Sequence, residues 1–279
     1  MSAPLLEVAD LRVAFPGQDG LREVVRGVSF TVGREKVGIV GESGSGKSMT
    51  ARAILDLIPP PGRVSAARLA FAGQDLTRAG ARARARLRGR RIAMVLQDPR
   101  HALNPVMTVG AQLAETFRTH HRLGRAEARR RSIEALDAVH IREPERVFGL
   151  YPHEISGGMG QRAMIAMMLA PDPELLLADE PTSALDATVE AGILETLDEL
   201  VTARGMGLVL VSHDLDLVAA FCDRVLVFYA GRIVEELPAH DLARARHPYT
   251  QGLLACVPRL GDRRQELPVL QRDPSWAAP

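Results

Sequence analysis

The sequence has few cysteines, few lysines and no long apolar run, and each scarcity excludes a class of protein. Its 279 residues include two cysteines, Cys222 and Cys256, which do not form a Cys-x-x-Cys pair. A disulfide framework or a zinc site is therefore not expected, and the chain is predicted to work in a reducing compartment. No run approaches the roughly 18 apolar residues of a membrane span, and the N-terminus has no signal-peptide pattern. We expect a cytoplasmic protein that meets membranes only through partners.

Positive charge comes almost entirely from arginine, because the only lysines are Lys36 and Lys47. Lysine and arginine together number 35 against 34 acidic residues, and the formal net charge is +1. This balance argues against a protein steered to nucleic acid by its overall charge. Seven arginines gather between Arg78 and Arg91, but no aromatic residues alternate with them. A solvated helical face is therefore favoured over a nucleic-acid patch, and no nucleic-acid partner is expected.

The apolar pattern predicts a mixed α/β chain with 46% hydrophobic residues. Alternating apolar and polar residues at 5–13 and 24–32 predict antiparallel strands joined by a hairpin-like connection, and another strand pair passes through 69–71. From about 100 to 170 the apolar spacing is helical, which indicates a helical insert. Short, continuously apolar strands, typical of a parallel sheet covered on both faces, are predicted at residues 37–40, 92–96, 175–178, 208–212 and 225–229.

One glycine-rich stretch lies between a predicted strand and a predicted helix, which is the setting of a phosphate-binding loop. It reads Gly41-Glu42-Ser43-Gly44-Ser45-Gly46-Lys47-Ser48. The glycines allow consecutive backbone N–H groups to turn toward phosphate oxygens, and the helix adds the positive end of its dipole. Lys47 is expected to reach the β- and γ-phosphates, and the Ser48 hydroxyl to ligate Mg²⁺. The stretch predicts nucleotide hydrolysis but does not indicate what the hydrolysis drives.

Two carboxylates follow a predicted parallel strand, at the edge of the sheet where α/β proteins place their chemistry. Asp179 suits the second shell of Mg²⁺, and Glu180 suits a general base for the water that attacks the γ-phosphate. His213 follows another predicted strand at the same edge, where it can contact the γ-phosphate.

A second anion site is predicted at Ser156-Gly157-Gly158-Met159-Gly160-Gln161, before a helical run. It lies more than a hundred residues after the phosphate-binding loop. A single γ-phosphate cannot require both sites from the same direction. The pattern therefore suggests that two chains face each other.

In this order, the motifs resemble those of the ATP-binding subunit of an ABC transporter, over about residues 5–236. The matching motifs are the Walker A loop at 41–48, the Q-loop Gln97, the signature at 155–161, Walker B at Asp179-Glu180, the D-loop Ser183-Ala184-Leu185-Asp186 and the switch His213. A narrower resemblance to the oligopeptide, dipeptide and nickel importer branch comes from Gln97-Asp98-Pro99, Leu103-Asn104-Pro105, the Ser-Gly-Gly-Met form of the signature and His247-Pro248-Tyr249-Thr250.

This resemblance implies an α/β fold with a P-loop (RecA-like) parallel sheet core, an N-terminal antiparallel β subdomain and an inserted helical subdomain. The expected ATPase domain is 1–236, with the insert at about 100–170 and an importer-type tail at 237–279. ATP and Mg²⁺ are the implied cofactors. The resemblance implies that Glu180, His213 and Gln97 are catalytic residues. It implies that Ser48, Gln97 and Asp179 bind the Mg²⁺ ion. ATP contacts are expected from residues 41–48, Phe15 as the adenine-stacking aromatic, Ser156, Gly157, Gly158, Gln161 and Asp186.

Three positions depart from the family pattern. Ile155 opens the signature where leucine is usual, and Gly160 stands where this branch commonly has arginine. Some relatives hold an iron–sulfur centre on a C-terminal cysteine cluster, whereas Cys256 stands alone, so none is expected.

The resemblance implies an ATPase that energises an importer for peptides or a related small solute such as nickel. Its expected partners are permease subunits, a second ATP-binding subunit that is a copy or a homologue, and, indirectly, an extracytoplasmic solute-binding protein. Its expected location is the cytoplasmic face of the membrane. One alternative is a soluble ABC ATPase acting on DNA or the ribosome, but the chain has neither a long coiled coil nor a second cassette. The other is an ATPase subunit of a non-transport assembly.

Overall fold

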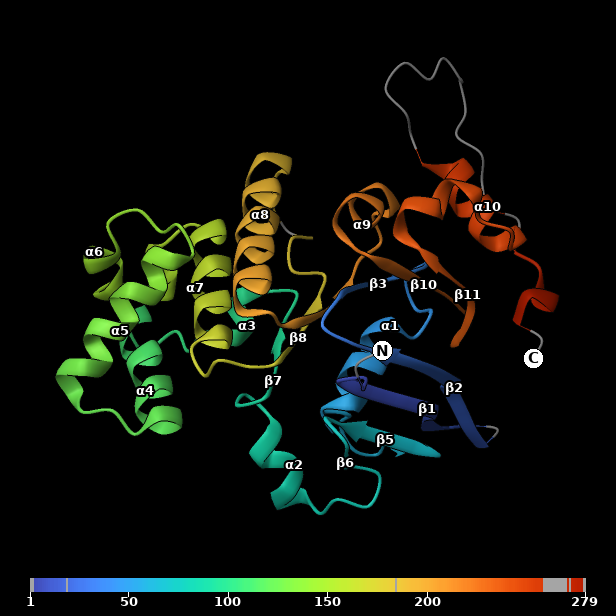
Figure 1. Cartoon of the computed structure of the whole chain (residues 1–279), viewed down its shortest axis with the longest axis horizontal. Coiled ribbons are helices and arrows are strands. Elements are labelled where there is room, and N and C mark those ends of the chain that lie inside the picture. Colours follow the sequence, from blue (N-terminus) through green and yellow to red (C-terminus); the bar gives the residue numbers. More distant parts are fainter. Residues whose placement is uncertain (1–2, 19, 184, 258–269, 271, 278–279) are drawn as a thin grey trace. The chain divides into compact units, whose positions relative to one another are not determined.

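The computed structural model describes residues 3–18, 20–183, 185–257, 270 and 272–277 (Figure 1). The chain divides into two compact units, Met1–Gly80 with Leu208–Pro279 and, between them in sequence, Ala81–Gly207. The first unit is discontinuous, because both ends of the chain contribute to it. The expected domain boundaries, a cassette to residue 236 with an insert at about 100–170, stay predictions.

The first unit contains the antiparallel sheet that the alternating sequence predicts. Leu6 and Val8 are buried, and so are Leu11 and Val13, so the alternation slips by one position between the two pairs. The predicted antiparallel strands and their hairpin-like connection are confirmed. The strands are β1 (Leu6–Gly17), which pairs with β2 (Gly20–Val32), β4 (Arg63–Ser65) and β5 (Arg68–Phe71), and β6 (Gln74–Asp75), which pairs with β5.

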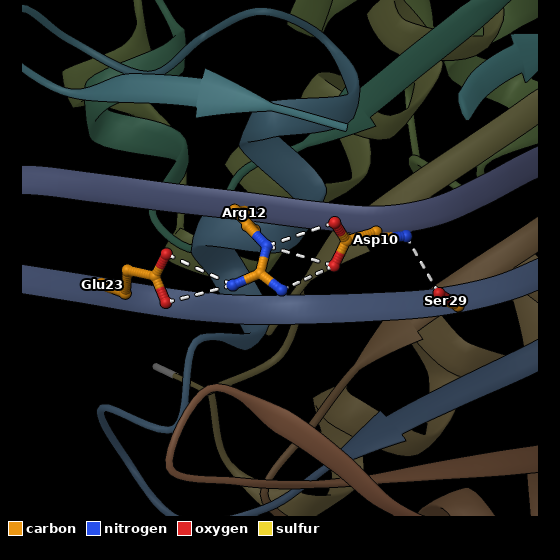
Figure 2. A network of polar contacts seen from close by, with 4 residues as sticks. All are labelled: Asp10, Arg12, Glu23 and Ser29. Carbon is orange, nitrogen blue, oxygen red and sulfur yellow. Dashed lines mark hydrogen bonds and ion pairs between the residues drawn. The ribbon is translucent and has the colours of Figure 1, made fainter. Parts of the chain in front are cut away.

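The slip in β1 is a β-bulge centred on Asp10, whose φ is 48°. Figure 2 shows the Asp10 carboxylate accepting hydrogen bonds from Arg12, at 3.1 Å from Nε and 2.8 Å from Nη2. Arg12 Nη1 also lies 3.4 Å from Glu23 of β2. Gly27 of β2, at φ 80°, lies against this network, because a Cβ there would be 2.5 Å from Asp10 Oδ1. Only glycine satisfies both the backbone angle and the close approach.

The first unit also contains strands that pair in parallel. β3 (Lys36–Val40) lies between β9 (Gly207–Val211) and β10 (Arg224–Tyr229) and runs parallel to both, whereas β11 (Arg232–Pro238) is antiparallel to β10. β9 is buried along its whole length, as the apolar runs predict. The helices are α1 (Lys47–Ile54), α9 (Leu215–Phe221), α10 (Pro248–Cys256) and the 3-10 helices Ala239–Arg244 and Pro274–Ala277.

The second unit is largely helical and contains one pair of parallel strands, β7 (Ile92–Val95) and β8 (Leu175–Asp179). The arginines of the predicted solvated face are exposed or half-buried, as that interpretation requires. Within the described residues, no helix has the length and apolarity needed to cross a bilayer. The helices are α2 (Ala81–Leu87), α3 (Pro99–Ala102), α4 (Val109–His121), α5 (Arg125–Ala138), α6 (Pro144–Phe148), α7 (Gly157–Leu169), α8 (Ala187–Arg204) and the 3-10 helix Pro152–Glu154.

Gly27→Ala is expected to lower the free energy of unfolding by about 2–4 kcal/mol, because the new Cβ adds left-handed backbone strain and a collision with Asp10. Gly73→Ala is the matched control, since Gly73 has nearly the same φ, 78°, but has no atom within 4 Å of its Cβ position. It should cost about 1–2 kcal/mol, the backbone strain alone. Urea unfolding measures both variants, and equal losses would contradict the role given to the Asp10–Arg12 network.

Candidate functional site

The phosphate-binding loop connects β3 to α1 in the first unit. Gly41 begins it at φ 147°, and a Cβ at this position would lie 2.2 Å from the Phe228 carbonyl oxygen of β10. Gly231, in the turn after β10, donates its N–H to the Ser45 carbonyl at 3.0 Å. The loop therefore lies directly on the end of the parallel sheet, where only glycine fits at its first position.

Lys47 is buried at the start of α1, with 5% of its surface exposed. Its Nζ donates to the carbonyl oxygens of Gly41 at 2.7 Å and Glu42 at 2.9 Å. Ser48 follows in the first helical turn and is half-buried. A buried ammonium at a helix N-terminus creates a positive potential that phosphate oxygens neutralise. The residues of this loop thus fit the phosphates of a nucleotide.

A contact that the sequence analysis did not predict lies behind the loop. The backbone N–H of Glu42 donates to the hydroxyl of Tyr249, at 3.0 Å. Tyr249 belongs to the His247-Pro248-Tyr249-Thr250 motif. This motif supports the resemblance to the peptide and nickel importer branch, but the sequence alone predicts no function for it. The two residues are 207 positions apart, so no local pattern predicts their contact.

In the second unit, the structure brings Gln97 and Glu180 together. Glu180 follows β8 with its backbone in the left-handed region, at φ 46°, and its side chain is half-buried. Gln97 Nε2 donates to Glu180 Oε2 at 3.1 Å. The neighbouring Asp179 is 3% exposed. This end of β8 therefore holds one buried carboxylate and a second that a side-chain amide orients.

The signature begins helix α7 of the same unit. Ser156 is the N-cap, and its Oγ accepts a hydrogen bond from the Met159 N–H at 3.3 Å. Ser156 and Gly157 are exposed and Gly158 is half-buried, but Gln161 is only 1% exposed. Its Nε2 has no hydrogen-bond partner among the described residues. The start of the motif is thus on the surface, whereas Gln161 points into the unit and its expected ATP contact stays a prediction.

The remaining site residues lie at the ends of secondary-structure elements. Asp186 is exposed and caps α8, with its Oδ1 accepting the Val189 N–H at 3.0 Å. His213 is exposed two residues after β9. Phe15 is half-buried in β1, opposite Arg22 of β2. The roles of these three residues stay predictions, and the D-loop residue 184 lies outside the described residues.

Comparisons with known proteins point to one family. The model of the family described as ABC transporter matches residues 25–183. The "Probable peptide ABC transporter ATP-binding protein y4tR" of Sinorhizobium fredii is 48% identical over 270 residues, which cover 95% of this chain and 81% of that protein. The "Dipeptide transport ATP-binding protein DppD" of Escherichia coli is 46% identical over 268 residues, with 95% and 82% covered.

A solved structure also resembles the chain, the ATP-binding cassette MJ0796 as a post-hydrolysis dimer bound to ADP and Pi. Its TM-score is 0.73 at 26% identity, covering 84% of this chain and 98% of the cassette. The likeness confirms the predicted P-loop α/β fold. With the family match and the two relatives, it shows that the chain belongs to the ABC transporter family as an ATP-binding cassette.

Proposed function

We propose that the chain is the ATP-hydrolysing subunit of an ABC importer for peptides. The relatives described above, 46–48% identical over 95% of the chain, are named for peptide and dipeptide transport, which favours peptides over nickel. The observation that carries the proposed hydrolysis is the Gln97–Glu180 hydrogen bond at the end of β8. A carboxylate oriented in this way can accept a proton from an attacking water.

In this proposal, residues 41–48 bind the phosphates of ATP. The Lys47 ammonium neutralises charge on the β- and γ-phosphates, and the N-terminus of α1 adds its dipole. Ser48, Gln97 and Asp179 would hold Mg²⁺, which neutralises charge that develops during phosphoryl transfer. Glu180 takes the proton of the attacking water, and His213 contacts the γ-phosphate.

A second ATP-binding subunit completes each site. Ser156 and Gly157 are exposed at the N-terminus of the 13-residue helix α7, an arrangement that suits a phosphate on a facing chain. The similar cassette MJ0796 is described as dimeric with ADP and Pi bound, which supports this arrangement. Two subunits would then enclose two ATP molecules, each between one chain's phosphate loop and the other chain's signature.

We assign the contact with the permease subunits to an apolar groove of about 310 Å³ beside the signature. Pro99, Leu103 and Ile155 are among its lining residues. Val106, just after the lining residue Pro105, is 79% exposed. Because the groove adjoins the signature, a permease segment bound in it can respond when the paired cassettes close. The chain would then be peripheral on the cytoplasmic face, and a solute-binding protein would deliver peptide from the other side.

The proposal predicts that the tagged chain, extracted from its native membranes in detergent, co-purifies with membrane-spanning subunits. In vesicles, peptide-loaded binding protein should raise ATP hydrolysis by this complex several-fold, because closure of the cassettes is coupled to peptide delivery. Mass spectrometry and phosphate release measure the two outcomes. Recovery with soluble proteins alone would contradict the importer assignment and favour a non-transport assembly.

Glu180→Gln should leave ATP binding nearly intact and slow hydrolysis by at least about a hundredfold, because the amide keeps the shape but cannot accept the proton. Single-turnover phosphate release by the assembled complex measures the effect. The matched control is Glu199→Gln on α8, a half-exposed residue beside His140, which should hydrolyse ATP at the original rate. Unchanged hydrolysis in the Glu180 variant would exclude this residue as the base.

Ser156→Arg should disable the ATP site whose phosphate loop belongs to the partner, because arginine blocks the helix N-terminus that faces it. The chain's own Lys47 should still bind ATP. Photo-crosslinking with an azido-ATP and turnover counts for each site separate the two effects. Loss of labelling on the variant chain itself, with hydrolysis preserved at the partner's site, would rule out the facing arrangement.

A further inference from the structure

The Gly41–Glu42 peptide bond of the phosphate loop has a side-chain contact at each end. Its carbonyl oxygen accepts a hydrogen bond from Lys47 Nζ at 2.7 Å, and its N–H donates to the Tyr249 hydroxyl at 3.0 Å. In a planar trans peptide, the C=O and N–H groups point in opposite directions. Lys47 and Tyr249 therefore fix the orientation of one peptide plane from opposite sides.

Tyr249 is itself held firmly by the segment between β11 and α10. The Glu235 carboxylate of β11 accepts the backbone N–H groups of Arg246 at 2.6 Å and His247 at 3.2 Å. His247 caps α10, and its Nδ1 lies 3.2 Å from the Tyr249 N–H. The Tyr249 side chain is fully buried. Because the backbone is fixed and the ring is buried, the hydroxyl has little freedom to move away from the Glu42 N–H.

Beyond residue 257 the structure describes residue 270 and residues 272–277, and this last segment also lies against Tyr249. The Trp276 ring lies 5.9 Å from Tyr249 and 5.8 Å from Tyr229 between centroids, and the Tyr229 ring lies 4.5 Å from Tyr249. Arg272 Nη2 pairs with the Glu42 carboxylate at 3.0 Å. The aromatic contacts surround Tyr249 with apolar surface, whereas the exposed Arg272 pair adds little stability.

We infer that Tyr249 is a positioning residue for the phosphate loop, whose hydroxyl fixes the Gly41–Glu42 peptide so that the Gly41 carbonyl oxygen holds Lys47 in position to bind phosphate. The inference rests on the proposed function of this loop as the ATP site. The phenol oxygen accepts the Glu42 N–H, and burial raises the pKa of Tyr249 to about 12, further above the physiological range. Because both partners belong to this chain, the contact can order the loop without the nucleotide, which lowers the cost of ordering it on binding.

The test is Tyr249→Phe in the full chain, which keeps the ring and removes only the acceptor of the half-buried Glu42 N–H. The dissociation constant for a nonhydrolysable ATP analogue with Mg²⁺, measured by calorimetry, should rise roughly three- to tenfold, the effect of losing one hydrogen bond. Hydrogen exchange in residues 38–46 should become faster. Tyr229→Phe is the matched control, because the Tyr229 hydroxyl donates a hydrogen bond to the Asp273 carbonyl oxygen, at 3.3 Å, and not to the loop. This variant should bind the analogue as the original chain does.

Two results would overturn the inference. A purely structural hydroxyl would lower the melting temperature without changing the dissociation constant or the exchange of the loop. Equal weakening in the Tyr229 and Tyr249 variants would assign the effect to the aromatic cluster instead. Lys47→Ala separates this inference from the proposed function. Unchanged ATP-analogue binding in the Lys47 variant would overturn the ATP site itself. If binding weakened in Lys47→Ala but not in Tyr249→Phe, only the role of Tyr249 would be overturned.

Discussion

The buried ammonium of Lys47 is the interaction on which the phosphate loop depends. A buried charge is costly unless polar groups surround it. The carbonyls of Gly41 and Glu42 supply those groups, and they can do so only because the loop turns tightly at the end of β3. This tight turn requires glycine at position 41, since a side chain there would collide with the Phe228 carbonyl. The charge of one side chain thus links the loop, the helix α1 and the strand β10.

The two units divide the proposed chemistry between them. The first contains the groups that bind phosphate, and the second contains the Gln97–Glu180 pair and the signature. Glu180 has an unusual left-handed backbone, at φ 46°. Strained backbone of this kind persists only where the surrounding structure fixes it, and it is frequent at functional sites. Its position directly after β8 agrees with the role proposed for this carboxylate.

Local patterns in the sequence predicted the elements whose signals lie within a few residues. The loop at 41–48 was recognisable from its spacing, and β9 was recognisable from its continuous apolar run. Asp10 illustrates what local patterns miss: the alternation slips there, but only the opposite strand, with Gly27, shows that a bulge results. Gln161 illustrates a second limit, because the turn of the helix buries it although it belongs to the signature motif. The contact of Tyr249 with Glu42 joins distant parts of the chain and had no sequence signal at all.

The discontinuity of the first unit has a consequence for synthesis on the ribosome. β3, which leads into the phosphate loop, pairs with β9 and β10, and both of these emerge only in the last third of the chain. The tyrosine behind the loop emerges later still. The strands β1 and β2 have each other as partners as soon as they emerge, but β3 and the phosphate loop cannot complete their sheet until the last third of the chain is made. A prematurely terminated chain would keep the entire glycine-rich motif and yet lack the support that shapes it.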